Sequence, residues 1–432
     1  MGRRPLQKPL QVLLNGRLVG WLTRQSDGAM AFRYDASWLE WSSCFPISLS
    51  LPLRDDSYRG PLVFAVFDNL LPDDLGVRRR VAERTGAAGA DAFSLLAAIG
   101  RDCVGALQFL PEGEDPAAPA KPTGRALSDA EIADLLSKLG PTPLGMDRDG
   151  EFRLSLAGAQ EKTALLRLRG RWFIPHGNTP TTHIFKPQIG RLRNGIDLSH
   201  SVENEHLTLC LAEALGLPVA RTEIHDFGTQ RALVVERFDR LWTKDGRLLR
   251  LPQEDCCQAL GVPPTRKYQA EGGPGMIDIL RLLQASDDPD TDRRLFLKAQ
   301  VVFWLLAATD GHAKNFSLSL RPGGGFGLTP LYDILSVQPM LDAGQLQPKS
   351  TKLAMAVGRH YRLDSIVARH FLQSAAAGGL AEDSATMVLD EVAAAAELAE
   401  DRLKPKIDDA VQAAILQSLL GGLRQRLRVI AR

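Results

Sequence analysis

The sequence predicts an α+β fold in which a small N-terminal α/β region precedes a strand-rich region and then a mainly helical one. Three observations support this prediction. Turn dipeptides separate the first apolar runs, at Asn15-Gly16 and Asp27-Gly28. Short β-prone segments return after residue 151. From about residue 275 the pattern is mainly helical, and residues 295–309 form its most apolar stretch.

The N-terminal region is predicted to hold an antiparallel sheet over residues 10–34, because both turn dipeptides supply the positive φ that tight hairpins need. Helical spacing follows over residues 64–86, where Pro72 interrupts the pattern and Gly86 ends it. A further helix and strand are expected over residues 93–110. Residues 111–124 (PEGEDPAAPAKPTG) lack an apolar face and are expected to form a linker.

The middle of the chain alternates short strands with one helix. Strands are expected at 152–156, within 162–175 and at 182–187. A helix at 203–216 should end at Gly216, since Pro218 follows closely. Two more strands are expected at 221–227 and 231–239. The Ala-rich segment 390–403 favours a helix.

Composition narrows the class of protein. The 432 residues, 44% of them hydrophobic, are enough for two or three domains with substantial cores. The 52 basic and 51 acidic residues give a net charge of +1, which argues against a whole-molecule grip on nucleic acid. Five cysteines without metal-ligand spacing, and no long apolar run, favour a cytoplasmic protein without disulfides, zinc or a membrane partner.

The segment ATDGHAKNF at 308–316 carries the strongest chemical signal. Asp310 and Asn315 have the D-x-x-x-x-N spacing of a protein-kinase catalytic loop. The carboxylate would meet a substrate hydroxyl, while the amide oxygen would reach a metal on the phosphates. The spacing alone is weak, because Asp and Asn commonly make turns or caps.

Two further residues strengthen that signal. Asp333 follows a strand-like segment, where a kinase places the Asp that binds Mg²⁺. Lys186 stands on a predicted strand, as does the lysine that contacts ATP phosphates, although a solvated strand-end lysine next to Pro187 is the alternative. Strand lysine, helix, catalytic loop and metal-binding Asp follow one another as in the protein-kinase fold.

No G-x-G-x-x-G or Walker A sequence is present. In the corresponding place, one strand pair before Lys186, stand the small residues of the segment SLAGAQEK at 155–162. Their backbone N–H groups could approach a phosphate closely, although an ordinary turn would look the same.

At this point several long motifs are similar to one family. The chain resembles the HipA-type serine/threonine kinase toxins of bacterial type II toxin–antitoxin systems, over nearly its whole length. The motifs that carry the resemblance are FDNLLPD, IGRDCVGA, SLAGAQEKTALL, TPTTHIFK, ALVVERFDR, RLPQEDCCQALG, GGPG, ATDGHAKNFS and LTPLYDI.

The resemblance implies a two-lobed protein-kinase-like fold related to the PI3/4-kinases. It divides the chain into an N-terminal subdomain at 1–110, a linker at 111–124, an N-lobe-like ATP-binding region at 125–240 and a mainly helical catalytic C-lobe at 241–432. Asp310 would be the catalytic base, and Asn315 and Asp333 the Mg²⁺ ligands. Ser155 matches the serine that the family autophosphorylates to silence itself; a phosphate there would repel those of ATP. The expected ATP-binding residues are Ala157, Gly158, Ala159, Gln160, Glu161, Lys162, Lys186, Glu236, Arg237, Phe238, His312, Ala313, Lys314, Asn315 and Asp333.

The resemblance also implies partners. Family members phosphorylate aminoacyl-tRNA synthetases, which stops growth, and bind a HipB-like helix-turn-helix antitoxin that represses the operon. In relatives, basic residues of the C-terminal domain touch operator DNA. Here residues 374–379 (SAAAGG) carry no positive charge, so operator contact is expected mainly through the antitoxin.

Two other functions fit the same motifs. The chain could be a catalytically inactive co-repressor, although its intact Asp310, Asn315, Asp333 and Lys186 argue against this. It could also be a small-molecule or lipid kinase, since a fold does not fix the substrate.

Overall fold

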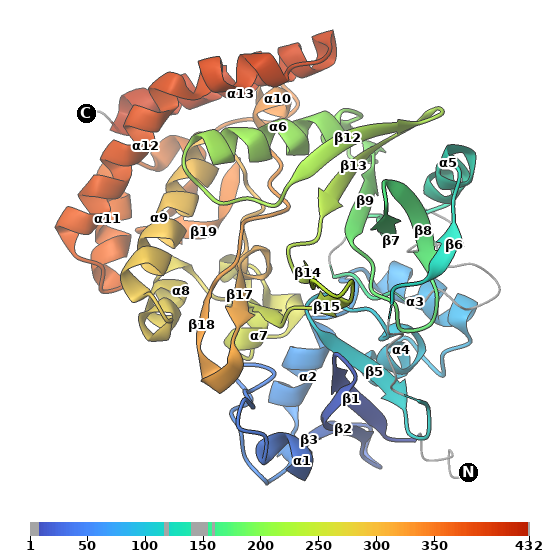
Figure 1. Ribbon diagram of the computed structural model, residues 1–432. Coiled ribbons are helices and arrows are strands. Elements are labelled where there is room, and N and C mark those ends of the chain that lie inside the picture. The colour runs from blue at the N-terminus through green and yellow to red at the C-terminus, as the bar shows by residue number, and fades with distance from the viewer. Residues whose placement is uncertain (1–7, 116–120, 140–153, 158–159, 431–432) are drawn as a thin grey trace. The chain divides into compact units, whose positions relative to one another are not determined.

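The structure, a computed structural model, describes residues 8–115, 121–139, 154–157 and 160–430 (Figure 1). The chain forms two compact units, and each is built from separate stretches of sequence. The first unit comprises residues 1–187, 226–265 and 319–325, and the second comprises residues 188–225, 266–318 and 326–432.

The first unit begins with an antiparallel five-stranded sheet in the order β4-β3-β2-β1-β5. Asn15 and Gly16 have φ values of 49° and 84°, as a tight hairpin between β1 and β2 requires. The predicted sheet over residues 10–34 is therefore confirmed. The strands are β1 (Leu10–Leu14), β2 (Arg17–Arg24), β3 (Met30–Tyr34), β4 (Tyr58–Arg59) and β5 (Leu107–Pro111).

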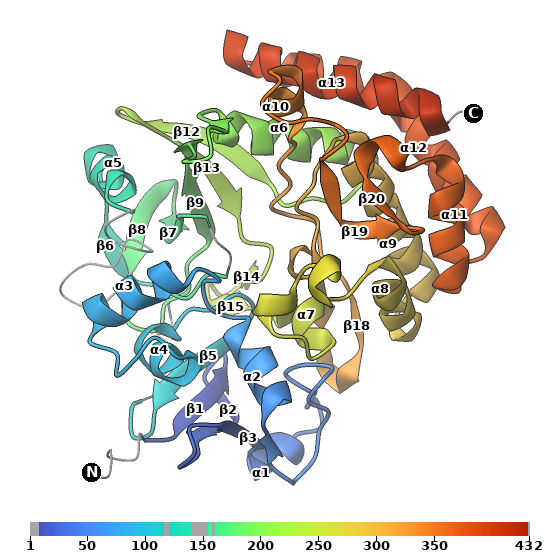
Figure 2. The ribbon, with the colours of Figure 1, turned by 180° about the vertical axis from the view of Figure 1, so that it is seen from behind.

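Helices α1 (Ala36–Leu39), α2 (Pro61–Asp68), α3 (Leu75–Thr85) and α4 (Ala92–Ile99) complete this subdomain (Figure 2). Helix α2 contacts β3, and α4 contacts β5. The chain breaks between α2 and α3 at Pro72, as predicted. Gly86 adopts the left-handed conformation that ends α3, with φ of 66°.

A second sheet of six strands has the order β12-β13-β9-β7-β8-β6. One face packs with α5 (Asp129–Ser137) around Phe185, Trp172, Ile132 and neighbouring apolar side chains. Its strands are β6 (Gly124–Ala126), β7 (Thr163–Leu168), β8 (Arg171–Pro175), β9 (His183–Pro187), β12 (Thr222–Phe227), which enters from the second unit, and β13 (Gln230–Glu236).

One predicted strand of this unit is wrong for the residues that the structure describes. Within 152–156, Leu154 makes only an isolated bridge to Asp102, and residues 155–156 are not in a strand. Residues 152–153 lie outside the described residues. The apolar side chains Leu154 and Leu156 are nevertheless buried, and so is Ser155 between them. The remaining elements of the unit are β14 (Arg240–Trp242), β15 (Leu248–Arg250), β16 (Gln253–Asp255) and α7 (Cys256–Ala259).

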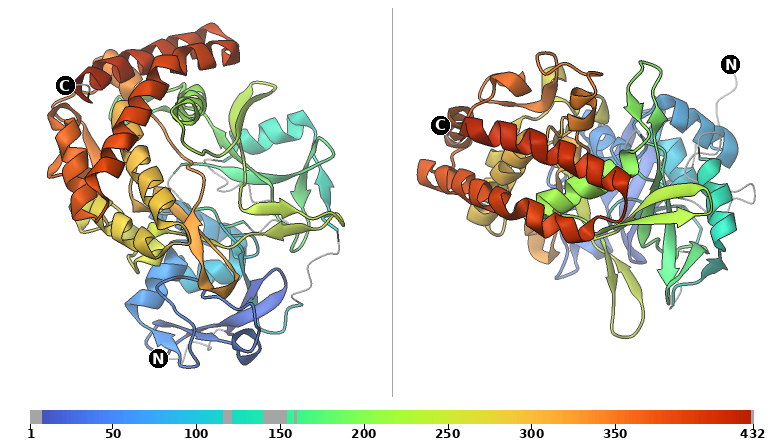
Figure 3. Two further views of the ribbon diagram at one scale, coloured as in Figure 1. Left: turned by 60° about the vertical axis from the view of Figure 1, so that its left-hand side comes forward. Right: turned by 90° about the horizontal axis from the view of Figure 1, so that it is seen from above.

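The second unit is mainly helical, as predicted for the C-terminal region. Helix α9 (Pro289–Leu305) is largely buried and packs against α12 (Glu382–Leu403), which also contacts α6 (Ser201–Ala214); α13 (Ala410–Ile430) lies over α6 as well (Figure 3). The other helices are α8 (Met276–Leu282), α10 (Gln338–Asp342) and α11 (Ala368–Ala377).

The helical region also contains strands, and the strand-like segment predicted before Asp333 is confirmed as one of them. Three others were missed, because two of them have only three and four residues and the third buries five consecutive residues, so no sustained two-residue alternation marks them. The strands are β17 (Ser317–Leu320), β18 (Phe326–Leu328), β19 (Lys352–Val357) and β20 (His360–Arg362); short β10 (Gly190–Arg191) and β11 (Asp197–Leu198) precede α6. Among the described residues, no helix is both long and apolar enough to cross a membrane.

Candidate active site

The loop that carries Asp310 begins where the buried helix α9 ends. Ala307 takes a left-handed φ of 50°, and the Ala308 N–H donates to the carbonyl of Phe303, which turns the chain sharply. Gly311 then lies so close to the Phe303 ring that a Cβ would come within 2.3 Å of it. The loop therefore requires a glycine at this position, and it leaves Asp310 with a side chain that is 65% exposed.

The backbone carbonyl of Asp310 fixes the rest of the loop. It accepts hydrogen bonds from the His312 N–H and from the Asn315 side-chain Nδ2, both at 2.8 Å. Asn315 ends the short helix η5 (Ala313–Asn315) and is buried. Because its Nδ2 donates to Asp310, the amide oxygen is left to act as an acceptor or a ligand. The D-x-x-x-x-N spacing is thus closed by a direct bond between its two ends.

The predicted metal ligand Asp333 lies on a segment tied to this loop. The Tyr332 hydroxyl donates to the Lys314 carbonyl at 3.0 Å and lies 2.5 Å from the Ser317 hydroxyl. Asp333 itself has a φ of 58°, a left-handed conformation that costs a non-glycine residue about 1 kcal/mol or more. The second unit therefore joins the segments of Asp310, Asn315 and Asp333, which lie apart in sequence.

His312, Ala313 and Lys314, the other predicted ATP-binding residues of this unit, are buried within the same loop. The His312 ring meets Tyr268 edge to face, with the ring centroids 5.0 Å apart. The Tyr268 hydroxyl in turn donates to Oδ1 of Asp310 at 2.6 Å. Sequence reasoning missed Tyr268, although it lies just before the motif GGPG.

Lys186 lies in the first unit, in β9, opposite Leu233 of β13. Its neighbour Phe185 points into the core of the six-stranded sheet, so Lys186 faces the other side of that sheet. The predicted position of Lys186 on a strand is correct. Only 5% of Lys186 is exposed, so the alternative of a solvated lysine at a strand end is wrong.

The small-residue segment lies before β7 in the same unit. Gly158 and Ala159 lie outside the described residues. Ala157 is half-buried, Glu161 is exposed and Lys162 is buried, while the Gln160 side chain reaches the Pro187 carbonyl at 3.5 Å.

Ser155, at the start of this segment, is fully buried. Its hydroxyl donates to the Leu70 carbonyl at 2.7 Å, and its N–H donates to the Asp102 carbonyl at 3.0 Å. Both acceptors belong to the N-terminal motifs FDNLLPD and IGRDCVGA. In this conformation the hydroxyl is therefore sequestered by the N-terminal subdomain.

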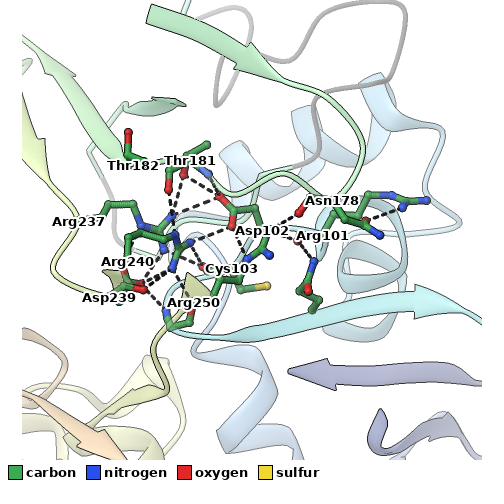
Figure 4. A network of polar contacts seen from close by, with 12 residues as sticks. Arg101, Asp102, Cys103, Asn178, Thr181, Thr182, Arg237, Asp239, Arg240 and Arg250 are labelled. Carbon is green, nitrogen blue, oxygen red and sulfur yellow. Dashed lines mark hydrogen bonds and ion pairs between the residues drawn. The ribbon is translucent and has the colours of Figure 1, made fainter. Parts of the chain in front are cut away.

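The predicted ATP-binding residues Glu236, Arg237 and Phe238 lie at the end of β13 and directly after it. Glu236 is exposed at the end of that strand and Phe238 is half-buried. The Arg237 N–H donates to the Thr182 carbonyl at 2.9 Å, so that donor is already used within the sheet. The Arg237 side chain turns away into a buried network of charges (Figure 4).

This network, which we call the arginine cluster, surrounds Asp102. Oδ1 of Asp102 accepts from Arg240 and Arg250, both at 2.9 Å, and Oδ2 accepts from Thr181 at 2.7 Å. Figure 4 shows the guanidinium groups converging on this carboxylate. The members of the arginine cluster are Asp102, Thr181, Arg237, Asp239, Arg240 and Arg250.

Electrostatics keep the arginine cluster ionised. Burial alone would raise the pKa of Asp102, but the charges of Arg240, Arg250 and Arg237 together hold its pKa well below the usual range. Burial lowers the pKa of Arg240 to about 10, still above neutral pH. The arginine cluster therefore carries three positive and two negative charges in the protein interior. Its ion pairs hold the surrounding segments together.

Comparisons with known proteins agree with this architecture. The family model described as HipA N-terminal domain matches residues 10–110, and the model described as HipA-like C-terminal domain matches residues 154–399. The chain is 37% identical over 412 residues to "Putative kinase Y4mE" of Sinorhizobium fredii, covering 93% of this chain and 94% of that protein.

It is also 31% identical over 373 residues to the serine/threonine-protein kinase toxin HipA of Shewanella oneidensis, covering 83% of this chain and 81% of that protein. A solved structure of the Shewanella oneidensis HipA in complex with HipB and operator DNA is similar in fold, with a TM-score of 0.80, 26% identity and 98% of both chains covered. The chain belongs to the HipA family and is a HipA-type kinase.

Proposed function

We propose that this chain is a serine/threonine kinase toxin that transfers the γ-phosphoryl group of ATP to a protein hydroxyl with the help of Mg²⁺. The observation that carries the proposal is the Asp310 loop, in which an exposed carboxylate and a buried amide are locked together by the bond from Asn315 to the Asp310 carbonyl. This arrangement presents a base to an incoming hydroxyl while it leaves an amide oxygen for another partner.

Asn315 and Asp333 fit a Mg²⁺ site by their chemistry. Both offer oxygen, the ligand that Mg²⁺ prefers, and two protein oxygens suffice because phosphate and water complete its shell. The described residues contain no group of three or more His, Cys, Asp or Glu that could hold a metal by themselves, and a metal that arrives with the nucleotide needs none. When bound, Mg²⁺ would neutralise charge on the phosphates.

In the proposed reaction Asp310 accepts the proton of a serine or threonine hydroxyl. The hydroxyl oxygen bonds to the γ-phosphorus, the bond from that phosphorus to the bridging oxygen breaks, and ADP leaves. Lys186, an ammonium on a buried strand, would neutralise phosphate charge, and the segment 157–162 with Glu236–Phe238 would contact the rest of ATP. The Lys186 role rests on its strand position and motif, and Lys186→Met should weaken nucleotide binding.

We further propose that the chain silences itself by autophosphorylation of Ser155. The buried hydroxyl donates to the Leu70 carbonyl, so this segment must leave its place before the hydroxyl can accept a phosphoryl group. A phosphate of about −1.5 to −2 charge would then prevent its return to the buried position.

The proposed partners come from the family. In the similar solved structure, the Shewanella oneidensis HipA is bound with HipB and operator DNA, which supports a HipB-like antitoxin for this chain. A net charge of +1 supports contact with operator DNA mainly through that antitoxin. We propose an aminoacyl-tRNA synthetase as the substrate and growth arrest as the result.

The test is incubation of the purified chain with radiolabelled ATP, Mg²⁺ and a cell lysate. We expect labelled protein bands with the wild type and none with Asp310→Asn. Label in lipid or metabolite but in no protein would instead identify a small-molecule kinase. Absence of both labelling and nucleotide binding would identify an inactive co-repressor.

A further inference from the structure

The contact between Tyr268 and Asp310 belongs to no role described above. The Tyr268 hydroxyl donates to Oδ1 of Asp310 at 2.6 Å. His312 Nε2 also lies nearest to that oxygen, at 3.9 Å. The second oxygen, Oδ2, belongs to a side chain that is 65% exposed.

The glycine-rich motif GGPG at 272–275 explains how Tyr268 is held. The N–H groups of Glu271 and Gly273 both donate to the Tyr268 carbonyl at 3.0 Å. A Cβ on Gly273 would come within 2.0 Å of the Arg266 carbonyl, and Gly272 has a φ of 84°. This tight turn therefore needs its glycines, and it fixes the backbone of Tyr268.

A second anchor comes from the residue after Tyr268. The Gln269 side chain accepts a hydrogen bond from the Ala356 N–H of β19 at 2.7 Å. Gly275 lies against the same side chain, since a Cβ there would come within 2.4 Å of Gln269 Nε2. The turn is thereby attached to a strand, and the Tyr268 ring rests against the buried His312 ring of the Asp310 loop.

We propose that Tyr268 is a positioning residue for the base. An exposed aspartate side chain samples several rotamers, and a base works only when its oxygen meets the reacting hydroxyl. By holding Oδ1, the Tyr268 hydroxyl selects one rotamer and leaves Oδ2 to accept the proton from the substrate. This inference rests on the proposed role of Asp310 as the base.

A competing role is that the phenol hydroxyl occupies the place of the substrate hydroxyl and inhibits the kinase. The exposure of Asp310 argues against this, because a blocking side chain would cover the carboxylate. The two roles predict opposite effects when the hydroxyl is removed.

The experiment compares wild type, Tyr268→Phe and Asp310→Asn in the full-length chain. The maximal rate of phosphate incorporation into the chain itself is measured with radiolabelled ATP and Mg²⁺, together with the ATP concentration for half-maximal rate and the melting temperature. Tyr361→Phe serves as the matched control, because Tyr361 is a half-buried tyrosine of the same unit that lies outside this loop.

For Tyr268→Phe we expect a maximal rate about 10- to 100-fold lower, as for loss of one hydrogen bond to a charged group, with unchanged half-saturating ATP and melting temperature. An unchanged or faster rate, or a fall that follows the melting temperature or the ATP requirement, would refute the positioning role. Full activity of Asp310→Asn in the same assay would instead refute the proposed function, so the two failures are distinguishable.

Discussion

Two aspartates of this chain, Asp102 in the first unit and Asp310 in the second, lie in motifs of the family and have opposite surroundings. Asp102 is 4% exposed and accepts hydrogen bonds from three arginines and a threonine. The side chain of Asp310 is 65% exposed, and a tyrosine hydroxyl is its close partner. A fully partnered, buried carboxylate has no capacity left for a substrate. An exposed carboxylate on a rigid loop has that capacity. The surroundings of the two carboxylates, and not the motifs they belong to, therefore indicate which of them can contact a substrate.

The largest effect is expected at Asp310, where a substitution should lower the activity and leave the stability unchanged. Under the proposed function, Asp310→Asn should reduce phosphate transfer by roughly 10²–10⁴-fold, because the amide cannot accept a proton. Its melting temperature should remain unchanged, since the exposed side chain packs little. Radiolabel incorporation and thermal unfolding measure the two quantities. A fall in melting temperature equal to that of a core variant would contradict the comparison.

The opposite pattern is expected at Asp102. Asp102→Asn should lower the free energy of unfolding by about 3–5 kcal/mol, because three buried guanidinium groups lose their shared countercharge. Chemical denaturation measures this loss. Asp245→Asn is the matched control, since Asp245 pairs with Arg247 on the surface and the variant should unfold like the wild type. Equal behaviour of the two variants would contradict a structural role for the arginine cluster.

A third prediction concerns Glu254, a carboxyl whose surroundings in the fold favour its neutral form. Burial raises the pKa of Glu254 to about 8, despite hydrogen bonds that include one from the Leu49 N–H. The folded chain therefore keeps this proton up to about pH 8, whereas the unfolded chain loses it near its usual pKa. The contribution of Glu254 to the free energy of unfolding should be fully present below that usual value. It should decrease as the pH rises toward 8, by at most about 1.4 kcal/mol per pH unit.

Glu254→Gln removes this titration and retains an acceptor for the Leu49 N–H. The pH dependence of the unfolding free energy should therefore be flatter in the variant than in the wild type between pH 5 and 8. Parallel curves for the two proteins would show that Glu254 is ionised when folded.

The smallest expected effect is at Ser155. Ser155→Ala removes the bond to the Leu70 carbonyl and should cost about 0.5–1.5 kcal/mol of unfolding free energy. Under the proposed function, mass spectrometry should find no phosphate at this position and activity should stay high. Ser137→Ala is the control, because its hydroxyl makes a similar bond to the Asp134 carbonyl on the exposed face of α5. Loss of ATP binding in Ser155→Ala would mean that the side chain has a structural role alone.

The sequence predicted much of the fold because local chemistry specifies it. Asn15-Gly16 determined a hairpin, Pro72 and Gly86 marked where helices break and end, and residues 295–309 proved largely buried in α9 and the loop after it. The strand predicted at 152–156 is wrong for the described residues 154–156, where Leu154 makes only an isolated bridge to Asp102 and no ladder follows. The sequence marked β18 as strand-like, but β17 and β20 were missed because they have only four and three residues, and β19 because five of its six residues are buried in a row.

For the site, the sequence by itself determined the residue types and their order: a lysine on a strand, an Asp and an Asn five positions apart, and a later Asp. Spacing can establish the Asp and the Asn because D-x-x-x-x-N closes within one loop, through the bond from Asn315 to the Asp310 carbonyl.

Only the tertiary structure decided which charged residues are structural. Asp102, Arg237 and Arg250 are far apart in sequence, so their ion pairs leave no local signal. The same holds for Tyr268, whose hydroxyl meets a carboxylate 42 residues further along the chain. Burial and long-range hydrogen bonds are set by packing, and packing depends on the whole folded chain.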